Sequence, residues 1–190
     1  PTSWSPNGRF LLLEKAASWK TTTPIGGLSD LWVLPLTGEL QPVPFLESPA
    51  RERNGQFSPD GRFVAFQSNE SGDWEVYVMP FPGPGPKVPV SAGGGRAPRW
   101  GPAGQEIFYL DFDNVLSAAS VTVEGDRLEV GAVRALFRLR PPQGRFPWQG
   151  SPIPYDVSAD GQSFLVIDVE REPEPAPIIV VLNWAAGRTE

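Results

Sequence analysis

A short turn pattern that recurs four times constrains this 190-residue chain more than any other feature of its sequence. Each copy has an aromatic or apolar residue, a Ser or Gly, a Pro or Ala, one further residue, a Gly, and then an apolar run. The copies occupy residues 3–13, 56–66, 99–109 and 156–166, and their turns are spaced 53, 43 and 57 residues apart. These spacings are close to the length of one propeller blade and too irregular for a solenoid.

The residues of the pattern are those of a tight β-hairpin. Pro presets the backbone at the first turn position, Asn or Asp is tolerated at the next, and Gly takes the positive φ that follows. The apolar run after the turn predicts a strand. We therefore interpret these turn residues as structural: Pro6, Gly8, Pro59, Asp60, Gly61, Gly104, Asp160 and Gly161.

Further strand-like segments follow each hairpin. Third strands are predicted at residues 30–35, 74–79, 115–123 and 177–183, and fourth strands at 41–45, 87–91 and 134–138. The fold class is therefore all-β, a β-propeller of four blades with mostly four antiparallel strands each, in one domain. The blades span about 1–47, 48–91, 92–139 and 140–190, and the last one is expected to lack a strand.

The missing strand leaves three alternatives for closure of the ring. The ring closes imperfectly, two chains associate as a homodimer that completes the propeller, or the sequence is cut from a longer propeller. An excised or reassembled fragment without its own activity is therefore one interpretation of the chain.

Composition excludes several function classes. The chain has 20 Gly and 23 Pro, which disfavour helices, and neither Cys nor His, which removes thiol chemistry and the usual triad base. The net charge of −6 argues against a nucleic-acid partner. No apolar run is long enough to insert into a membrane.

Several motifs identify a family. The Ser-Pro-Asp-Gly-Arg turn at residues 58–62, with the strands at 64–66 and 75–78, resembles the TolB-type, WD-repeat-like β-propeller repeat. Residues 30–36, 68–72, 79–83 and 91–95 are similar to the same family, and residues 179–184 to propellers attached to bacterial serine/threonine kinases. The resemblance implies an adaptor or sensor that binds a protein partner in an extracytoplasmic or periplasmic location.

Catalysis is not expected. The nucleophile elbow of an α/β-hydrolase is absent, as are kinase motifs, and no cofactor is implied. The alternative is an accessory propeller of a hydrolase or carbohydrate-active enzyme that uses two carboxylates. The carboxylates that could serve are Glu52, Glu70, Asp73, Asp111 and Asp113.

The turn at residues 111–114 is rich in oxygen ligands. Asp111 and Asp113 are weak candidates for a calcium site, because hard cations prefer several such oxygens. The stretch lacks the length of an EF-hand loop, so a plain β-turn is the favoured interpretation and no metal is expected.

Aromatic residues divide into two groups. Trp4, Phe57 and Trp100 occupy equivalent repeat positions and are expected in the core between sheets. Trp19, Trp74 and Trp148 fall in or beside loops. A loop Trp either anchors a partner or covers a blade edge, and the sequence leaves both open.

Residues just before each repeat turn should line the mouth of the propeller near its axis. A locally basic mouth would attract a small anionic ligand or an acidic partner segment at the axis. The Pro-rich segment 140–150 is either a second binding loop or a linker between blades three and four. The candidate binding residues are Arg51, Glu52, Arg53, Arg96, Arg99, Tyr155, Trp19, Trp74, Arg145 and Trp148.

Overall fold

The computed structural model describes residues 1–16, 29–125, 127–140 and 153–167. These residues form antiparallel sheets that we call blades one to four in chain order. Blade one has β1 (Ser3–Trp4), β2 (Phe10–Ala16), β3 (Ser29–Pro35) and β4 (Val43–Leu46); blade two has β5 (Glu52–Phe57), β6 (Phe63–Ser68), β7 (Glu75–Pro80) and β8 (Val88–Pro89); blade three has β9 (Arg96–Trp100), β10 (Glu106–Leu110), β11 (Val115–Glu124) and β12 (Arg127–Arg138); blade four has β13 (Tyr155–Val157) and β14 (Phe164–Val166).

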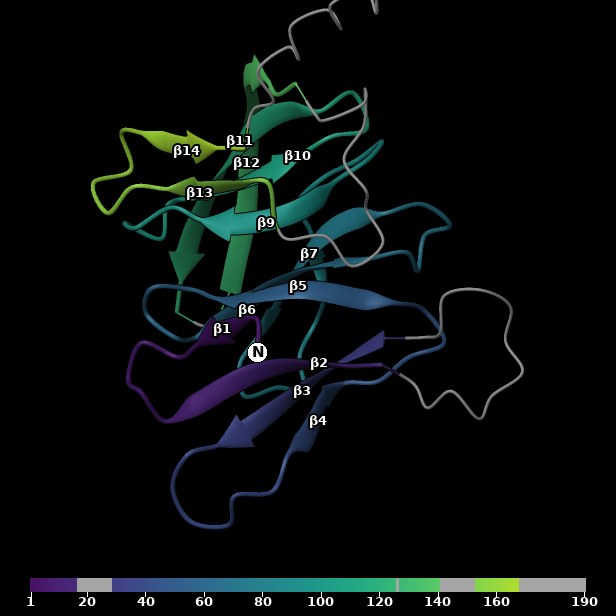
Figure 1. Cartoon of the computed structure of the whole chain (residues 1–190), viewed down its shortest axis with the longest axis vertical. Coiled ribbons are helices and arrows are strands. Elements are labelled where there is room, and N and C mark those ends of the chain that lie inside the picture. The colour runs from purple at the N-terminus through teal and green to yellow at the C-terminus, as the bar shows by residue number, and fades with distance from the viewer. Residues whose placement is uncertain (17–28, 126, 141–152, 168–190) are drawn as a thin grey trace, which may run out of the picture.

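The four sheets follow one another in space in the order of the chain (Figure 1). Within each sheet the strands lie in sequence order, so every connection is a hairpin. The described residues form consecutive antiparallel sheets, three of them four-stranded, and contain no helix. This arrangement fits a propeller. The predicted third strand of blade four, at residues 177–183, lies outside the described residues.

Each sheet packs on its neighbours through alternating side chains. On β6, Val64 and Phe66 lie in a core cluster with blade one, whereas Phe63 and Ala65 lie in a cluster with blade three. All four are buried. The period-two alternation of a strand thus gives one blade two apolar faces, and the consecutive apolar run of residues 63–66 follows from burial on both sides.

The four repeat turns have one backbone geometry. Gly8, Gly61, Gly104 and Gly161 have φ between 70° and 73°, a region that Gly enters without steric cost. In each turn the Gly N–H donates to the carbonyl three residues earlier. Asp60 and Asp160 each accept from a Ser hydroxyl and a backbone N–H. Those hydrogen bonds hold the pKa of Asp160 below its ordinary value and, against the opposing effect of burial, that of Asp60 as well.

Trp4 departs from the sequence prediction. Phe57 and Trp100 are buried as expected, with 4% and 5% of their surface exposed, but Trp4 is 62% exposed. The prediction that Trp4 is core is therefore wrong. Phe57 packs against blade one and Trp100 against blade two, whereas no sheet precedes blade one among the described residues.

The β11–β12 hairpin reaches from blade three onto blade two. Leu128, near the tip of the hairpin, is buried in a cluster with Phe63 and Val78 of blade two. At the tip, Arg62 Nη1 donates to the carbonyl of Gly125 at 2.8 Å. The hairpin therefore fastens blade three to blade two beyond the contact of their inner strands.

Removing the apolar contact at this hairpin should destabilise the fold. We expect Leu128→Ala to lower the free energy of unfolding by about 2–5 kcal/mol, because a buried Leu loses its transfer energy and leaves a cavity. The matched control is Val133→Ala on the same strand, where the side chain is 50% exposed and the change should stay within about 0.5 kcal/mol. Urea unfolding measures both, and equal losses would contradict the fastening role.

Candidate functional site

The predicted mouth corresponds to the starts of the inner strands, and we keep the name mouth for the starts of β5 and β9 on blades two and three. Asn54 and Ala97 occupy equivalent repeat positions, and both have a positive φ, 54° and 53°. The ladder register shifts beside each of them, as in a β-bulge. Gln67 Oε1 accepts from Asn54 Nδ2 at 2.9 Å and from the Ala97 N–H at 2.8 Å. This amide joins the two strand starts and fixes where Arg53 and Arg96 emerge.

Arg53 and Arg96 precede these bulges and are half-buried. Arg53 Nε donates to Ser29 Oγ of blade one at 3.2 Å. The Arg96 guanidinium lies over the Phe112 ring, 4.3 Å from its centroid. Burial is the main reason that the pKa of Arg96 lies below its usual value, and the charges of Asp73 and Asp111 oppose this effect. The mouth therefore carries carboxylates beside its arginines.

A second contact holds the loop that leads into Arg96. Glu75 accepts from the N–H groups of Gly93 and Gly94 at 2.7 and 2.8 Å and from the Ser91 hydroxyl. A Cβ at Gly94 would come within 2.4 Å of the Phe112 ring, so only Gly allows that ring to lie there. The Gly-rich stretch 93–95 is the sequence signal for this arrangement, but the sequence alone does not reveal the aromatic partner.

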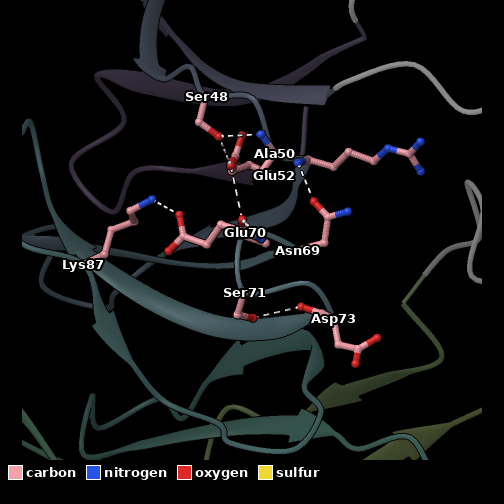
Figure 2. A network of polar contacts seen from close by, with 10 residues as sticks. Ser48, Ala50, Glu52, Asn69, Glu70, Ser71, Asp73 and Lys87 are labelled. Atoms are coloured by element: carbon pink, nitrogen blue, oxygen red, sulfur yellow. Dashed lines mark hydrogen bonds and ion pairs between the residues drawn. The ribbon is translucent and has the colours of Figure 1, made fainter. Parts of the chain in front are cut away.

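Glu52 lies at the start of β5 with none of its surface exposed. Its Oε1 accepts from Ser48 Oγ at 2.7 Å and from Ser68 Oγ at 3.2 Å (Figure 2). Its Oε2 has no hydrogen-bond partner. Burial raises the pKa of Glu52 above its ordinary value, and the two Ser hydroxyls act in the opposite direction. Glu52 therefore acts inside the blade and does not face a partner.

Tyr155 is also buried, and it joins blades three and four. Its hydroxyl donates to the Ala97 carbonyl at 2.7 Å, and only 3% of its surface is exposed. Desolvation strongly raises its pKa. Arg99, on the neighbouring strand, forms an ion pair with Asp156 at 3.6 Å. Both residues thus connect blades, and Tyr155 does not face solvent at the mouth.

The remaining candidate residues separate into different places. Trp74 is half-buried directly before β7, and the Arg51 N–H donates to Asn69 Oδ1 at 2.8 Å. Trp19, Arg145 and Trp148, and most of the segment 140–150, lie outside the described residues. The structure thus brings Arg96 onto the Phe112 ring and Arg53 to Ser29 of blade one, and sequence reasoning missed Phe112.

Two of the carboxylates proposed for catalysis or metal binding, Glu70 and Asp111, already have partners within the fold. Glu70 pairs with Lys87, and Asp111 Oδ1 accepts from the N–H groups of Asp113 and Val115 at 2.8 Å each, as in a plain turn. Within the described ranges, no group of three or more Asp, Glu, His or Cys side chains is placed to hold a metal ion. The same residues include no helix of the length and hydropathy that a membrane span requires.

Two hollows lie between blades two and three, and the first of them lies beside the repeat turns, at the opposite end of the inner strands from the mouth. One, of about 480 Å³, is lined by Ser58, Asp60 and Trp100. The other, of about 460 Å³, lies between β7 and β12 and is lined mainly by apolar residues such as Val78 and Leu128.

Comparisons with known proteins identify the fold class. The chain has a TolB-like β-propeller fold. It is similar to TolB from Acinetobacter baumannii, with a TM-score of 0.60 and 18% identity over 89% of this chain and 37% of that one. A TolB-type protein of Agrobacterium tumefaciens gives 0.54 and 20% over 72% and 48%. The periplasmic gluconolactonase of Pseudomonas aeruginosa gives 0.50 and 19% over 86% and 48%.

The chain therefore spans less than half the length of these solved relatives. No family model matches the sequence. No curated protein matches it either.

The buried carboxyl of Glu52 makes a pH-dependent prediction. A raised pKa in the folded state means that folding is favoured most at low pH and loses stability as pH rises from about 4.5, the ordinary value, through the folded pKa. Gln has nearly the same shape and does not titrate. We expect Glu52→Gln to be more stable relative to the parent chain at pH 7 than at pH 4, as measured by urea unfolding at both values.

The control for this measurement is Glu52→Ala. It leaves the hydroxyls of Ser48 and Ser68 without their acceptor and should cost about 1–3 kcal/mol. If the free energies of unfolding of the parent chain and Glu52→Gln differ by the same amount at pH 4 and pH 7, the assignment of a raised pKa to Glu52 is contradicted.

Proposed function

We propose that this propeller is a non-enzymatic binding module, an adaptor or sensor whose mouth receives an acidic segment of a protein partner. The observation that carries the proposal is the placement of Arg53 and Arg96 at equivalent positions on adjacent inner strands, joined through Gln67. Both arginines are half-buried residues on fixed backbone, which lowers the entropy cost of binding a carboxylate. A rigid scaffold that presents such side chains is typical of a binding site.

The carboxylates near the mouth define the kind of partner. Asp73 and Asp111 act on Arg96, so a bound carboxylate must share the guanidinium with them. Such a site favours a short peptide with a few acidic side chains and additional contacts to the Phe112 ring over a diffuse polyanion. The TolB-like fold supports an interaction role, and the periplasmic gluconolactonase among the solved relatives supports an extracytoplasmic location.

A second candidate function is that of an enzyme or its accessory propeller. The gluconolactonase relative is the observation that favours it, although a likeness at 19% identity shows only the fold. Hydrolysis of gluconolactone by the purified chain, absent from a heat-denatured sample, would favour this candidate over the binding module.

The binding proposal is tested by charge reversal. The probe is a hexaglutamate peptide titrated into the chain by calorimetry at low salt, with hexalysine as the opposite-charge peptide. We expect Arg53→Glu combined with Arg96→Glu to weaken hexaglutamate binding at least tenfold, because two attractive charges become repulsive. Binding by the parent chain should also weaken as salt rises.

The matched control is Arg9→Glu combined with Arg134→Glu. It changes the net charge by the same amount at exposed positions away from the mouth. If both double variants weaken hexaglutamate binding equally, the effect comes from overall charge and the proposed site is contradicted. Unchanged binding by the mouth variant would also overturn the proposal.

A further inference from the structure

One face of blade one is built mainly from apolar side chains of three strands, with Lys15 Nζ over the Trp32 ring at 3.5 Å from its centroid. In the ladder, Trp4 is opposite Leu11, Leu11 is opposite Leu34, and Leu13 is opposite Trp32. Residues directly opposite each other point to the same side of a sheet, and so do residues two apart on one strand. Trp4, Leu11, Leu13, Trp32 and Leu34 therefore share one side, which we call the blade-one face.

The corresponding face of blade two shows what such a surface does in this protein. The repeat spacing of 53 residues places Phe57, Val64 and Phe66 at the positions of Trp4, Leu11 and Leu13. Tyr77 lies opposite Phe66 and Met79 opposite Val64, as Trp32 lies opposite Leu13 and Leu34 opposite Leu11. All five are at most 8% exposed, and they pack on Leu12, Leu31 and Val33 of blade one.

Blade three repeats the arrangement. Its Trp100, Ile107 and Tyr109 stand at the same repeat positions as Trp4, Leu11 and Leu13. They are buried in one cluster with Phe63 and Ala65 of blade two. Two interfaces inside the chain thus use this face in the same way.

A polar contact accompanies both interfaces. Ser3 Oγ of blade one accepts from the Phe57 N–H of blade two at 3.1 Å. Gln56 Oε1 of blade two accepts from the Trp100 N–H of blade three at 2.7 Å. Ser3 and Gln56 occupy equivalent repeat positions, so each blade supplies an acceptor to the inner strand of the next.

On the blade-one face the apolar surface is open. Trp4 is 62% exposed, and Leu11, Leu13, Trp32 and Leu34 are half-buried, whereas their counterparts on blade two are buried. Leu11, Leu13 and Leu34 lie side by side with Trp4 and Trp32 in the ladder, so the exposed apolar atoms are contiguous. Contiguous exposed apolar surface of this kind marks an interaction site.

We propose that the blade-one face is a docking surface for one further four-stranded blade of the same repeat, supplied by polypeptide other than a second copy of this chain. The occupant would present aliphatic side chains, as Leu12, Leu31 and Val33 do toward blade two. It would also supply an acceptor side chain for the Trp4 N–H, as Ser3 and Gln56 do at the two interfaces within the chain. The inference concerns assembly and is independent of what the mouth binds.

The first test compares Trp4→Gln with Phe57→Gln in the chain as it is. These residues are equivalent in the repeat but differ in exposure, 62% against 4%. Phe57→Gln should lower the urea midpoint strongly, while Trp4→Gln should leave it nearly unchanged. Equal losses would mean that the face is already covered within the chain and would overturn the proposal.

The second test supplies a blade. A copy of residues 48–96 is fused directly before Pro1, because Pro1 occupies the repeat position of Ala97 and the fusion reproduces the junction between blades two and three. We expect acrylamide quenching of Trp4, isolated by subtracting the spectrum of the Trp4→Phe fusion, to fall several-fold, and the thermal midpoint to rise.

The control fusion carries Ala65→Glu in the added copy only, which places a charge in the contact that Ala65 makes with blade three in the parent chain. It should leave Trp4 as quenchable as in the unfused chain. Equal quenching of Trp4 in both fusions would overturn the proposal. Light scattering of the unfused chain tests the alternative that a second copy is the occupant. If the unfused chain is a dimer and Trp4→Gln makes it a monomer, the occupant is a second copy and the choice of partner is overturned.

Discussion

Apolar packing between consecutive sheets is the interaction on which the rest of this structure depends. Blades two and three bury both of their faces, and the clusters around Phe66 and Ile107 contain residues of two blades each. A single four-stranded sheet cannot bury two apolar faces alone, so each blade is stable only beside others. The turns, the bulges at Asn54 and Ala97 and the Tyr155 hydrogen bond all act at the places where these sheets meet.

The packing also decides which parts of the site are well supported. Arg53 and Arg96 lie on blades two and three, which have a neighbour on each side. The β11–β12 hairpin adds a further connection between the same two blades through Leu128 and Arg62. A binding site at the mouth therefore rests on the most constrained part of the chain, while the exposed apolar residues Trp4 and Leu165 belong to blades one and four.

Local features of the fold could be predicted from the sequence, because they depend on neighbouring residues alone. Gly at a fixed place in the repeat predicts a positive φ, and the apolar run after it predicts a strand. The third strands of blades one to three and β4 and β8 lie close to where they were predicted, whereas β12 includes the predicted residues 134–138 but begins at Arg127. The prediction for Trp4 failed because burial depends on a neighbouring blade, which no local pattern reports. Glu52 and Tyr155 looked like mouth residues by position, but their side chains point into the blades, and only the packed structure reveals this.

The same reasoning connects the blade-one face to the mouth. Inner strands are positioned by contacts from one blade to the next: Ser3 accepts from the Phe57 N–H, and Gln56 from the Trp100 N–H. The N–H donors of these contacts lie on strands that also carry a mouth residue, since Phe57 and Arg53 are both on β5, and Trp100 and Arg96 are both on β9. A blade docked on Trp4 would fix β1 in the way that blade one fixes β5. Assembly at the face therefore acts on β1, whereas binding at the mouth depends on β5 and β9, which neighbouring blades already position within this chain.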